Sequence, residues 1–285
     1  QVSVIVTQII TFYSLISDLC VRRWYLPYIL YKQPEQGWQL FDKVFQEPQN
    51  SLWKEASYCF YYQYYSHFDK VKPYLDKLIK EAPNEAGEVW SHISTLAYLS
   101  GYITEDDLFT TLEGLNLNAA WKSAIDVFTG NFDKKEHHKT CETGFLRIIG
   151  VTTSSKETLR KIEFLFGDKQ NHQQFISKKL AIAFINAIQD DENMSLTYFF
   201  DWLAFISIQD PEKALELCEK LIKKLNLLQA PCRMWHTDPL ISTLDNILKE
   251  ADESNDIELI HRAIALQDGF LGLDIRGVDE FINEN

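Results

Sequence analysis

The chain has 285 residues, of which 46% are hydrophobic, so it can bury a large core as one elongated domain or as two compact ones. Its 11 glycines and 8 prolines are too few for an all-β protein, which needs a turn about every 8–12 residues. The formal net charge of −13 disfavours binding of nucleic acid or anionic lipid over the whole surface.

The first segment, Val2 to about Tyr25, is the most hydrophobic part of the chain. Polar residues such as Gln8 interrupt it before Asp18, whereas a membrane helix needs about 20 predominantly apolar residues. We therefore expect a core helix here and no membrane span. The chain starts at Gln1 without a methionine, and we expect it to be a C-terminal fragment of a larger protein.

The following stretches have the spacing of amphipathic helices. Pro34 is placed where the first turn of a helix tolerates proline, and an apolar stripe follows it. The stripe consists of Trp38, Leu40, Phe41, Val44 and Phe45. Residues Ser51–Ala82 combine an aromatic first half, which has no wholly polar face, with a second half that has one apolar stripe and contains Pro73 at a kink or a helix start. Because a helix that is apolar all round must be covered on several sides, 51–82 is the expected inner helix of the fold.

Capping residues mark the helices that follow. Asn84 is the expected start and Gly101 the expected end of one helix, and Thr104 with Asp107 forms a capping box before the next. Further helices are expected over about 118–130, 134–149, 154–166, 170–189, 195–205, 210–225, 238–251, 257–266 and 278–282.

These patterns predict an all-α protein of about thirteen helices, with no convincing strand pair. Helix pairs recur roughly every 30 to 45 residues, and the tetratricopeptide signature is absent. We predict an irregular HEAT/TPR-like α-solenoid of stacked antiparallel helix pairs, with a compact all-α domain as the alternative. Because no linker or low-complexity run divides the chain, residues 1–285 are expected to form a single continuous helical-repeat domain.

The cysteines indicate a reducing compartment. Their odd number, wide spacing and apolar neighbours are typical of buried, reduced thiols in a cytoplasmic protein. The five are Cys20, Cys59, Cys141, Cys218 and Cys232.

One cysteine has the spacing of a metal ligand. His137 and Cys141 are four residues apart and would offer two zinc ligands on one helical face. A full site needs two more ligands, and no second pair has that spacing, so a partly exposed helix start is the alternative interpretation.

The segment from Cys232 to Asp238 gathers the most reactive side chains of the chain. Cys232 and His236 would be the nucleophile and base of a hydrolase. Nothing nearby supplies an obvious oxyanion hole, so we favour a structural corner in which Trp235 is buried and Arg233 pairs with an acid.

Other motifs indicate no chemistry. The glycine-rich run Gly269–Gly277 lacks the lysine-serine/threonine ending of a phosphate loop and is expected to be a turn between the last two helices. Carboxylate pairs such as Asp106–Asp107 and Asp190–Asp191 are placed at loops or helix starts, where solvation and the helix dipole explain them. We therefore expect no catalytic residue, no metal site and no cofactor in this chain.

The only concentrated basic patch lies near the middle of the chain. It offers anion contact through Lys134, Lys135 and Lys139, and a solvated face is the alternative, given the opposing total charge. The patch consists of Lys134, Lys135, His137, His138 and Lys139, with Arg160, Lys161, Lys178 and Lys179 joining it if successive repeats stack. An alternative function is therefore a nucleic-acid-binding helical-repeat module that uses Lys134–Lys139, and a stand-alone scaffold is a further alternative.

Four tyrosines in the aromatic half of 51–82 are candidates for partner binding. Tyr61, Tyr62, Tyr64 and Tyr65 span more than one helical turn, so they cannot all be buried. Exposed tyrosine is favoured at protein interfaces, whereas core packing is the alternative role for these rings. The complete set of expected partner-binding residues is Tyr61, Tyr62, Tyr64, Tyr65, Arg233, Trp235 and His236.

Several stretches carry a resemblance to a known family. They are LPYILYKQPEQGWQLFDKVFQEPQNSLWKEASYCFYY with KVKPYLDKLIKEAPNE after it, LNAAWKSAIDVFTGNF in the middle, and IHRAIALQDGFLGLDIRGVDEF at the end. Together they resemble the C-terminal helical-repeat region of bacterial STAND-type NTPases, including those of anti-phage defence. The likeness covers most of the chain and is a pattern of spacing and helix ends, not a diagnostic motif.

In that family an N-terminal effector and a central P-loop ATPase precede repeats that detect a target protein, and target binding promotes assembly. The resemblance implies that this chain is a non-enzymatic, target-sensing module. It implies as partner a phage structural or packaging protein, and it assigns ATP, Mg and self-assembly to a missing NTPase portion of the parent protein.

Overall fold

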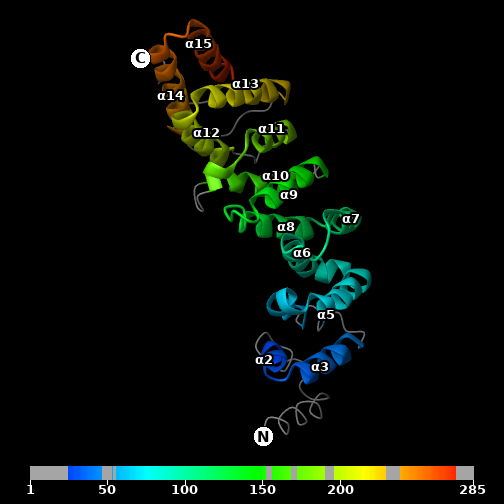
Figure 1. Ribbon diagram of the computed structural model, residues 1–285. Helices are drawn as coiled ribbons and strands as arrows, with labels where there is room; N and C mark the ends of the chain where they lie inside the picture. Colours follow the sequence, from blue (N-terminus) through cyan, green and yellow to red (C-terminus); the bar gives the residue numbers. More distant parts are fainter. Residues whose placement is uncertain are drawn as a thin grey trace. The chain divides into compact units, whose positions relative to one another are not determined.

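The computed structural model describes residues 25–46, 53, 56–151, 156–167, 172–189, 196–228 and 238–273. Within these ranges the regular structure is helical throughout and contains no strand (Figure 1). The all-α prediction is confirmed for this part of the chain. None of the helices in the described ranges is long and apolar enough to cross a membrane. The helices expected over 2–24 and 278–282 lie outside the described residues.

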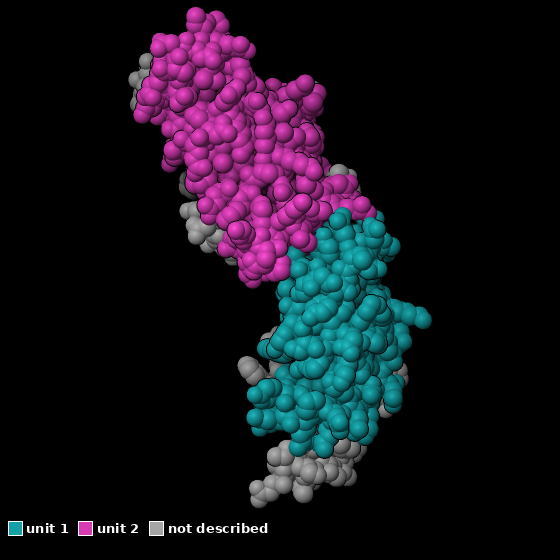
Figure 2. Space-filling model, in the orientation of Figure 1, with its two compact units in different colours: residues 1–127 teal, residues 128–285 magenta. Residues whose placement is uncertain are grey.

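Two compact units make up the chain, residues 1–127 and residues 128–285 (Figure 2). The boundary between them falls inside helix α8, Asn118–Thr129. The single continuous domain expected over 1–285 stays a prediction.

Unit 1 consists of α2 (Tyr25–Lys32), α3 (Pro34–Gln46), α5 (Phe60–Glu81), α6 (Pro83–Leu99), α7 (Glu105–Leu115) and the greater part of α8. Helix α2 packs on α3, α5 on α6, and α6 on α7. The Tyr74 hydroxyl donates a hydrogen bond of 2.6 Å to Asp42, and Lys77 donates to the carbonyl of Phe45. Both bonds join α3 to α5 at an offset of 32 residues, so these two helices run parallel.

Aromatic rings fill the space between α3 and α5. The apolar stripe predicted after Pro34 is buried, and its Phe41 stacks on Phe60 with ring centroids 5.2 Å apart. Phe45 stacks on Trp53 at 5.6 Å, and the Trp53 indole N–H donates to the carbonyl of Val44. Large rings of this kind supply most of the buried apolar area of a core.

Helix α5 bends where its sequence pattern changes. His67 has non-helical dihedrals, φ −142° and ψ 43°, and separates the aromatic half of the helix from the half with a single apolar stripe. Pro73, which was expected at a kink or a helix start, lies six residues later inside the regular second half. The bend therefore occurs where the buried face must change, not at the proline.

The helix ends in unit 1 largely follow the capping residues. Thr104 and Asp107 form the predicted capping box, in which each backbone N–H donates to the side chain of the other residue at 3.1 Å. Gly101 has a φ of 77° and follows α6, as expected of a terminal glycine. Asn84 is not the N-cap, because α6 already begins with Pro83, whose missing N–H is harmless in a first turn.

Unit 2 contains α9 (His138–Val151), α10 (Lys156–Glu163), η2 (Phe164–Phe166), η4 (His172–Phe175), α11 (Lys178–Ala187), α12 (Thr197–Gln209), α13 (Pro211–Leu228), α14 (Asp238–Ser254) and α15 (Ile257–Leu271). Alternate helices contact one another, so that α9, α11, α13 and α15 form one row in chain order. In a second row, α12 follows η2 and packs on α14 (Figure 1).

Side-chain bonds connect successive members of each row. In the first row, Ser177 donates to Glu142 of α9, and Lys224 of α13 donates to the carbonyl of Asn186 on α11. In the second row, the Tyr198 N–H of α12 donates to Glu163 of α10, and Asn246 of α14 donates to Ser207 of α12. These four bonds span 35 to 39 residues of sequence.

Three predicted boundaries in unit 2 are wrong for physical reasons. The helix expected over 134–149 begins at His138, because residues 134–137 form a turn. The helix expected over 170–189 is interrupted, and α11 starts after Ser177, whose hydroxyl accepts from the Leu180 N–H. Gly269 lies inside α15 and not in a turn. A Cβ at Gly269 would lie 2.9 Å from Ile222 of α13, so the absence of a side chain lets the two helices approach closely.

Candidate functional site

The four predicted tyrosines divide into exposed and half-buried pairs. Tyr62 and Tyr65 are 60% and 61% exposed, whereas Tyr61 and Tyr64 are half-buried. The expectation that the four rings cannot all be buried is therefore confirmed. Tyr102, which follows α6, is 48% exposed and was not singled out from the sequence.

Contacts between α5 and the turn after α6 hold the ring of Tyr102 against α5. The Tyr102 hydroxyl donates a 2.7 Å hydrogen bond to the carbonyl of Tyr65, and the Tyr102 ring stacks on buried Phe68 at 5.2 Å. The Tyr64 and Tyr65 rings meet edge to face at 5.9 Å. We call the exposed rings of Tyr62, Tyr65 and Tyr102 the tyrosine surface.

Tyr61 packs on the neighbouring helix α6. Its ring lies 4.6 Å from the imidazole of His92 and stacks with Tyr58 at 6.1 Å. Burial raises the pKa of Tyr61 to about 12, and Tyr58 and Glu88 add to this shift. Burial also lowers the pKa of His92, against the opposing effect of Asp126 and Glu88. The phenol and the imidazole are therefore both neutral at pH 7.

The sequence around this surface is acidic. Residues 81–121, which contain α6 and α7, include no lysine or arginine. Their acidic residues are Glu81, Glu85, Glu88, Glu105, Asp106, Asp107 and Glu113. Hydrogen bonds from Thr104 lower the pKa of Asp107, and nearby Lys72 contributes to the same shift. The segment that carries α6, Tyr102 and α7 therefore has a net negative charge.

The predicted basic patch is interrupted by acids. Lys134, Lys135 and Lys139 are exposed, but Asp133 and Glu136 alternate with them and are exposed as well. A patch with this composition attracts anions weakly.

Two further members of the expected patch have structural partners. The His138 ring packs on Phe132, and its Nδ1 lies 3.0 Å from the Phe132 carbonyl oxygen. Lys178 forms an ion pair with Glu216. Contact of Lys134, Lys135 and Lys139 with an anion stays a prediction.

The described cysteines are buried, as predicted. Cys59, Cys141 and Cys218 are free thiols, and burial raises the pKa of Cys59 and of Cys141 to about 12 and that of Cys218 as well. Protonated, buried thiols are poor nucleophiles and poor metal ligands. In the described ranges, no three His, Cys, Asp or Glu side chains form a group that could hold a metal ion.

The reactive side chains predicted from the sequence precede the described residues of α14. Cys232, Arg233, Trp235 and His236 lie outside the described residues, as does Cys20. Their predicted roles stay predictions.

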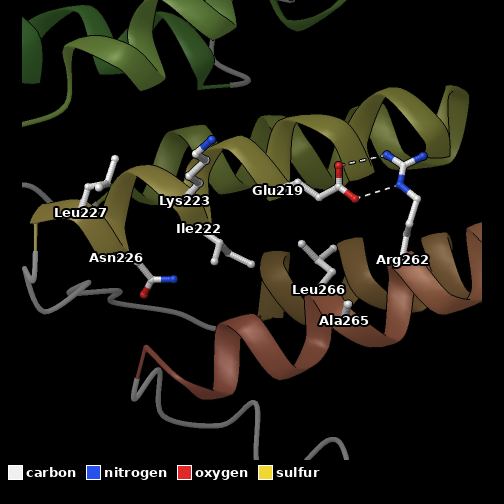
Figure 3. Close-up of a pocket in the computed structure, with 8 residues that line it drawn as sticks. All are labelled: Glu219, Ile222, Lys223, Asn226, Leu227, Arg262, Ala265 and Leu266. Carbon is white, nitrogen blue, oxygen red and sulfur yellow. Dashed lines mark hydrogen bonds and ion pairs between the residues drawn. The ribbon is translucent and has the colours of Figure 1, made fainter.

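A groove between α13 and α15 is a second candidate site (Figure 3). It has a volume of about 470 Å³, and Ile222 and Leu266 point toward one another across it. Arg262 closes one end with two hydrogen bonds to Glu219, of 2.9 and 3.0 Å. Leu227, which is 75% exposed, lies at the other end. The groove was not predicted, since its walls come from two helices whose paired residues Glu219 and Arg262 are 43 residues apart in sequence.

Comparison of the chain with protein-family models, with curated proteins and with solved structures finds no match.

Proposed function

We propose that this chain is a non-enzymatic protein-recognition module built as an irregular α-solenoid. The solenoid is supported by the bonds between alternate helices, which span from 29 residues, for Ser91 and the carbonyl of Ala120, to 43 residues, for Arg262 and Glu219. In a solenoid, each helix pair contacts the next pair along the chain, about one repeat length away, and buries its apolar face.

The observation that carries the recognition role is the tyrosine surface. Tyr62, Tyr65 and Tyr102 expose large rings. The Tyr102 ring is held by its hydrogen bond to the Tyr65 carbonyl and by stacking on Phe68, and the Tyr65 ring meets Tyr64 edge to face. Rings that are already fixed lose little conformational entropy on binding, so they are efficient anchors for a protein partner.

We further propose that the module is the target-sensing C-terminal region of a STAND-type defence ATPase in the cytoplasm. This step rests on the sequence resemblance described above. On this proposal the partner is a phage structural or packaging protein, and the ATP and magnesium chemistry belongs to another part of the parent protein.

The test is co-purification of the chain with phage structural and packaging proteins that are expressed one at a time. We expect one of them to bind, and Tyr62→Ala/Tyr65→Ala to weaken its binding at least about tenfold, because truncation of aromatic anchors has effects of this size. The matched control is Tyr31→Ala on α2, which removes a ring that is 74% exposed elsewhere in unit 1.

Two results would oppose the proposal. If none of these proteins binds, and deletion of the region leaves the response of the full-length protein unchanged, the sensing role is wrong. If a partner binds equally well to the double variant and to Tyr31→Ala, the tyrosine surface is not the site.

A further inference from the structure

We propose that the acidic face formed by Glu88 of α6 and Asp126 of α8, together with the neighbouring rings of Tyr58 and Tyr61, recognises an arginine-bearing basic segment of the partner protein. This inference rests on the proposed function and specifies the chemistry of the partner. It is drawn from the position of two carboxylates beside the aromatic rings, and from the charge of the sequence around them.

The first step is the place of Glu88. It precedes His92 by one turn of α6, and the Tyr61 ring lies 4.6 Å from the imidazole of His92. Glu88 is exposed and contributes to the raised pKa of Tyr61, so its carboxylate acts on the ring assembly. The exposed carboxylate of Glu88 thus lies near the half-buried rings of Tyr58 and Tyr61.

The second step is the approach of α8. The Ser123 hydroxyl donates a 3.0 Å hydrogen bond to the carbonyl of Glu88, which holds α8 beside α6. Asp126 follows Ser123 by three residues, is exposed, and acts on His92 together with Glu88. Two carboxylates from two helices therefore flank the rings of Tyr58 and Tyr61.

The third step is the balance of charge. Lys122 precedes Asp126 by one turn of α8 and offsets part of the negative charge. Lys72 is ion-paired with Asp76 at 2.7 Å and lies near Asp107. Residues 81–121 contain no lysine or arginine, and His92 is neutral at pH 7, so this segment has a net negative charge and attracts a positively charged partner.

The fourth step distinguishes arginine from lysine. A guanidinium group is planar, stacks on aromatic faces and binds carboxylates with two parallel hydrogen bonds. Rings adjoining carboxylates satisfy both requirements at once. An ammonium group is more strongly hydrated and offers neither the stacking plane nor the fork.

The experiment measures binding of three fluorescein-labelled hexapeptides, of arginine, lysine and citrulline, to the full chain by fluorescence anisotropy at low salt. We expect the arginine peptide to bind at least about threefold more tightly than the lysine peptide, the citrulline peptide not to bind, and added salt to weaken binding. Glu88→Gln/Asp126→Asn should lower the affinity for the arginine peptide at least about fivefold, and Tyr61→Leu, which replaces the neighbouring ring with an apolar side chain, about threefold.

The matched control is Glu250→Gln/Glu253→Gln on α14, which removes the same charge from exposed positions of unit 2. We expect this control to change the affinity less than twofold. Equal binding of the arginine and lysine peptides, or equal losses in the two charge variants, would show general attraction to an acidic protein and overturn the inference. If that happens while a phage protein still requires Tyr62 and Tyr65, the proposed function stands and only the arginine specificity fails.

Discussion

At the scale of single residues, Glu163 illustrates how a tertiary contact replaces a local cap. Helix α12 follows Leu196, which has a φ of 54° and whose side chain makes no capping bond. Glu163 of α10 instead accepts a 2.8 Å hydrogen bond from the Tyr198 N–H. The residue is only 5% exposed. Burial raises the pKa of its carboxyl group to about 7, against the hydrogen bonds that lower it and with a further rise from Asp201.

Glu163 should make the stability of unit 2 depend on pH. Its folded pKa lies above its usual value of 4.5, so its contribution is fully present below pH 4.5 and is lost as the pH rises through about 7. The loss is at most about 3.5 kcal/mol, since each pKa unit corresponds to about 1.4 kcal/mol. We expect Glu163→Gln to remove most of this decrease in the free energy of unfolding. Urea unfolding at several pH values from 4.5 to about 8 measures it.

Glu253→Gln is the control, because Glu253 is an exposed carboxylate of the same unit. If the free energy of unfolding depends on pH in the same way for the wild type, the control and Glu163→Gln, the buried carboxyl group does not titrate in this range.

At the scale of helices, close packing depends on where small residues lie. A Cβ at Gly144 of α9 would lie 2.5 Å from the Phe128 ring, whose side chain is fully buried. Gly150, in the last turn of the same helix, has nothing within 4 Å of the equivalent position. The two glycines therefore have different roles in one element.

Gly144→Ala should destabilise unit 2 by about 1–3 kcal/mol, because the Phe128 ring must shift in a filled core. Gly150→Ala should leave stability within about 0.5 kcal/mol of wild type, or raise it slightly, since alanine favours the helix. Urea unfolding of the two variants side by side measures the difference. Equal stability of both would mean that α9 and Phe128 are not packed closely.

Sequence patterns predicted where the helices form better than they predicted where a helix is interrupted. The Thr104–Asp107 capping box and the stripe after Pro34 follow from neighbours in sequence, and both are confirmed. The break before α11 is different, because the Gln173 carbonyl accepts a 3.0 Å bond from the indole N–H of Trp202, 29 residues away. A long-range contact of this kind overrides helix propensity, and the neighbouring residues in sequence give no signal of it. The tyrosines from Tyr61 to Tyr65 were likewise predicted from neighbours in sequence. Tyr102 was missed, because its position depends on a hydrogen bond to the Tyr65 carbonyl, 37 residues away.

At the scale of the whole molecule, charge decides between classes of partner. The net charge of −13 repels a phosphate backbone, and Asp133 and Glu136 weaken the basic patch formed by Lys134, Lys135 and Lys139. Protein recognition is therefore favoured over the nucleic-acid-binding alternative.

We expect the chain to bind a 30-base-pair duplex more weakly than about 10⁻⁴ M at physiological salt, the weak end of non-specific binding. Lys134→Ala/Lys135→Ala/Lys139→Ala should leave this result unchanged in an anisotropy titration. Micromolar binding that falls steeply with salt, and that the triple variant abolishes, would instead identify these lysines as a nucleic-acid contact.

The bonds between alternate helices have a consequence for how the chain is made. Those described above reach back no more than 43 residues, so each new helix finds its bonding partner in a segment synthesised shortly before. At about 5–20 residues per second on the ribosome, that interval is roughly 2–9 seconds. The protein can therefore fold vectorially, one hairpin after another, while its later part is still being translated.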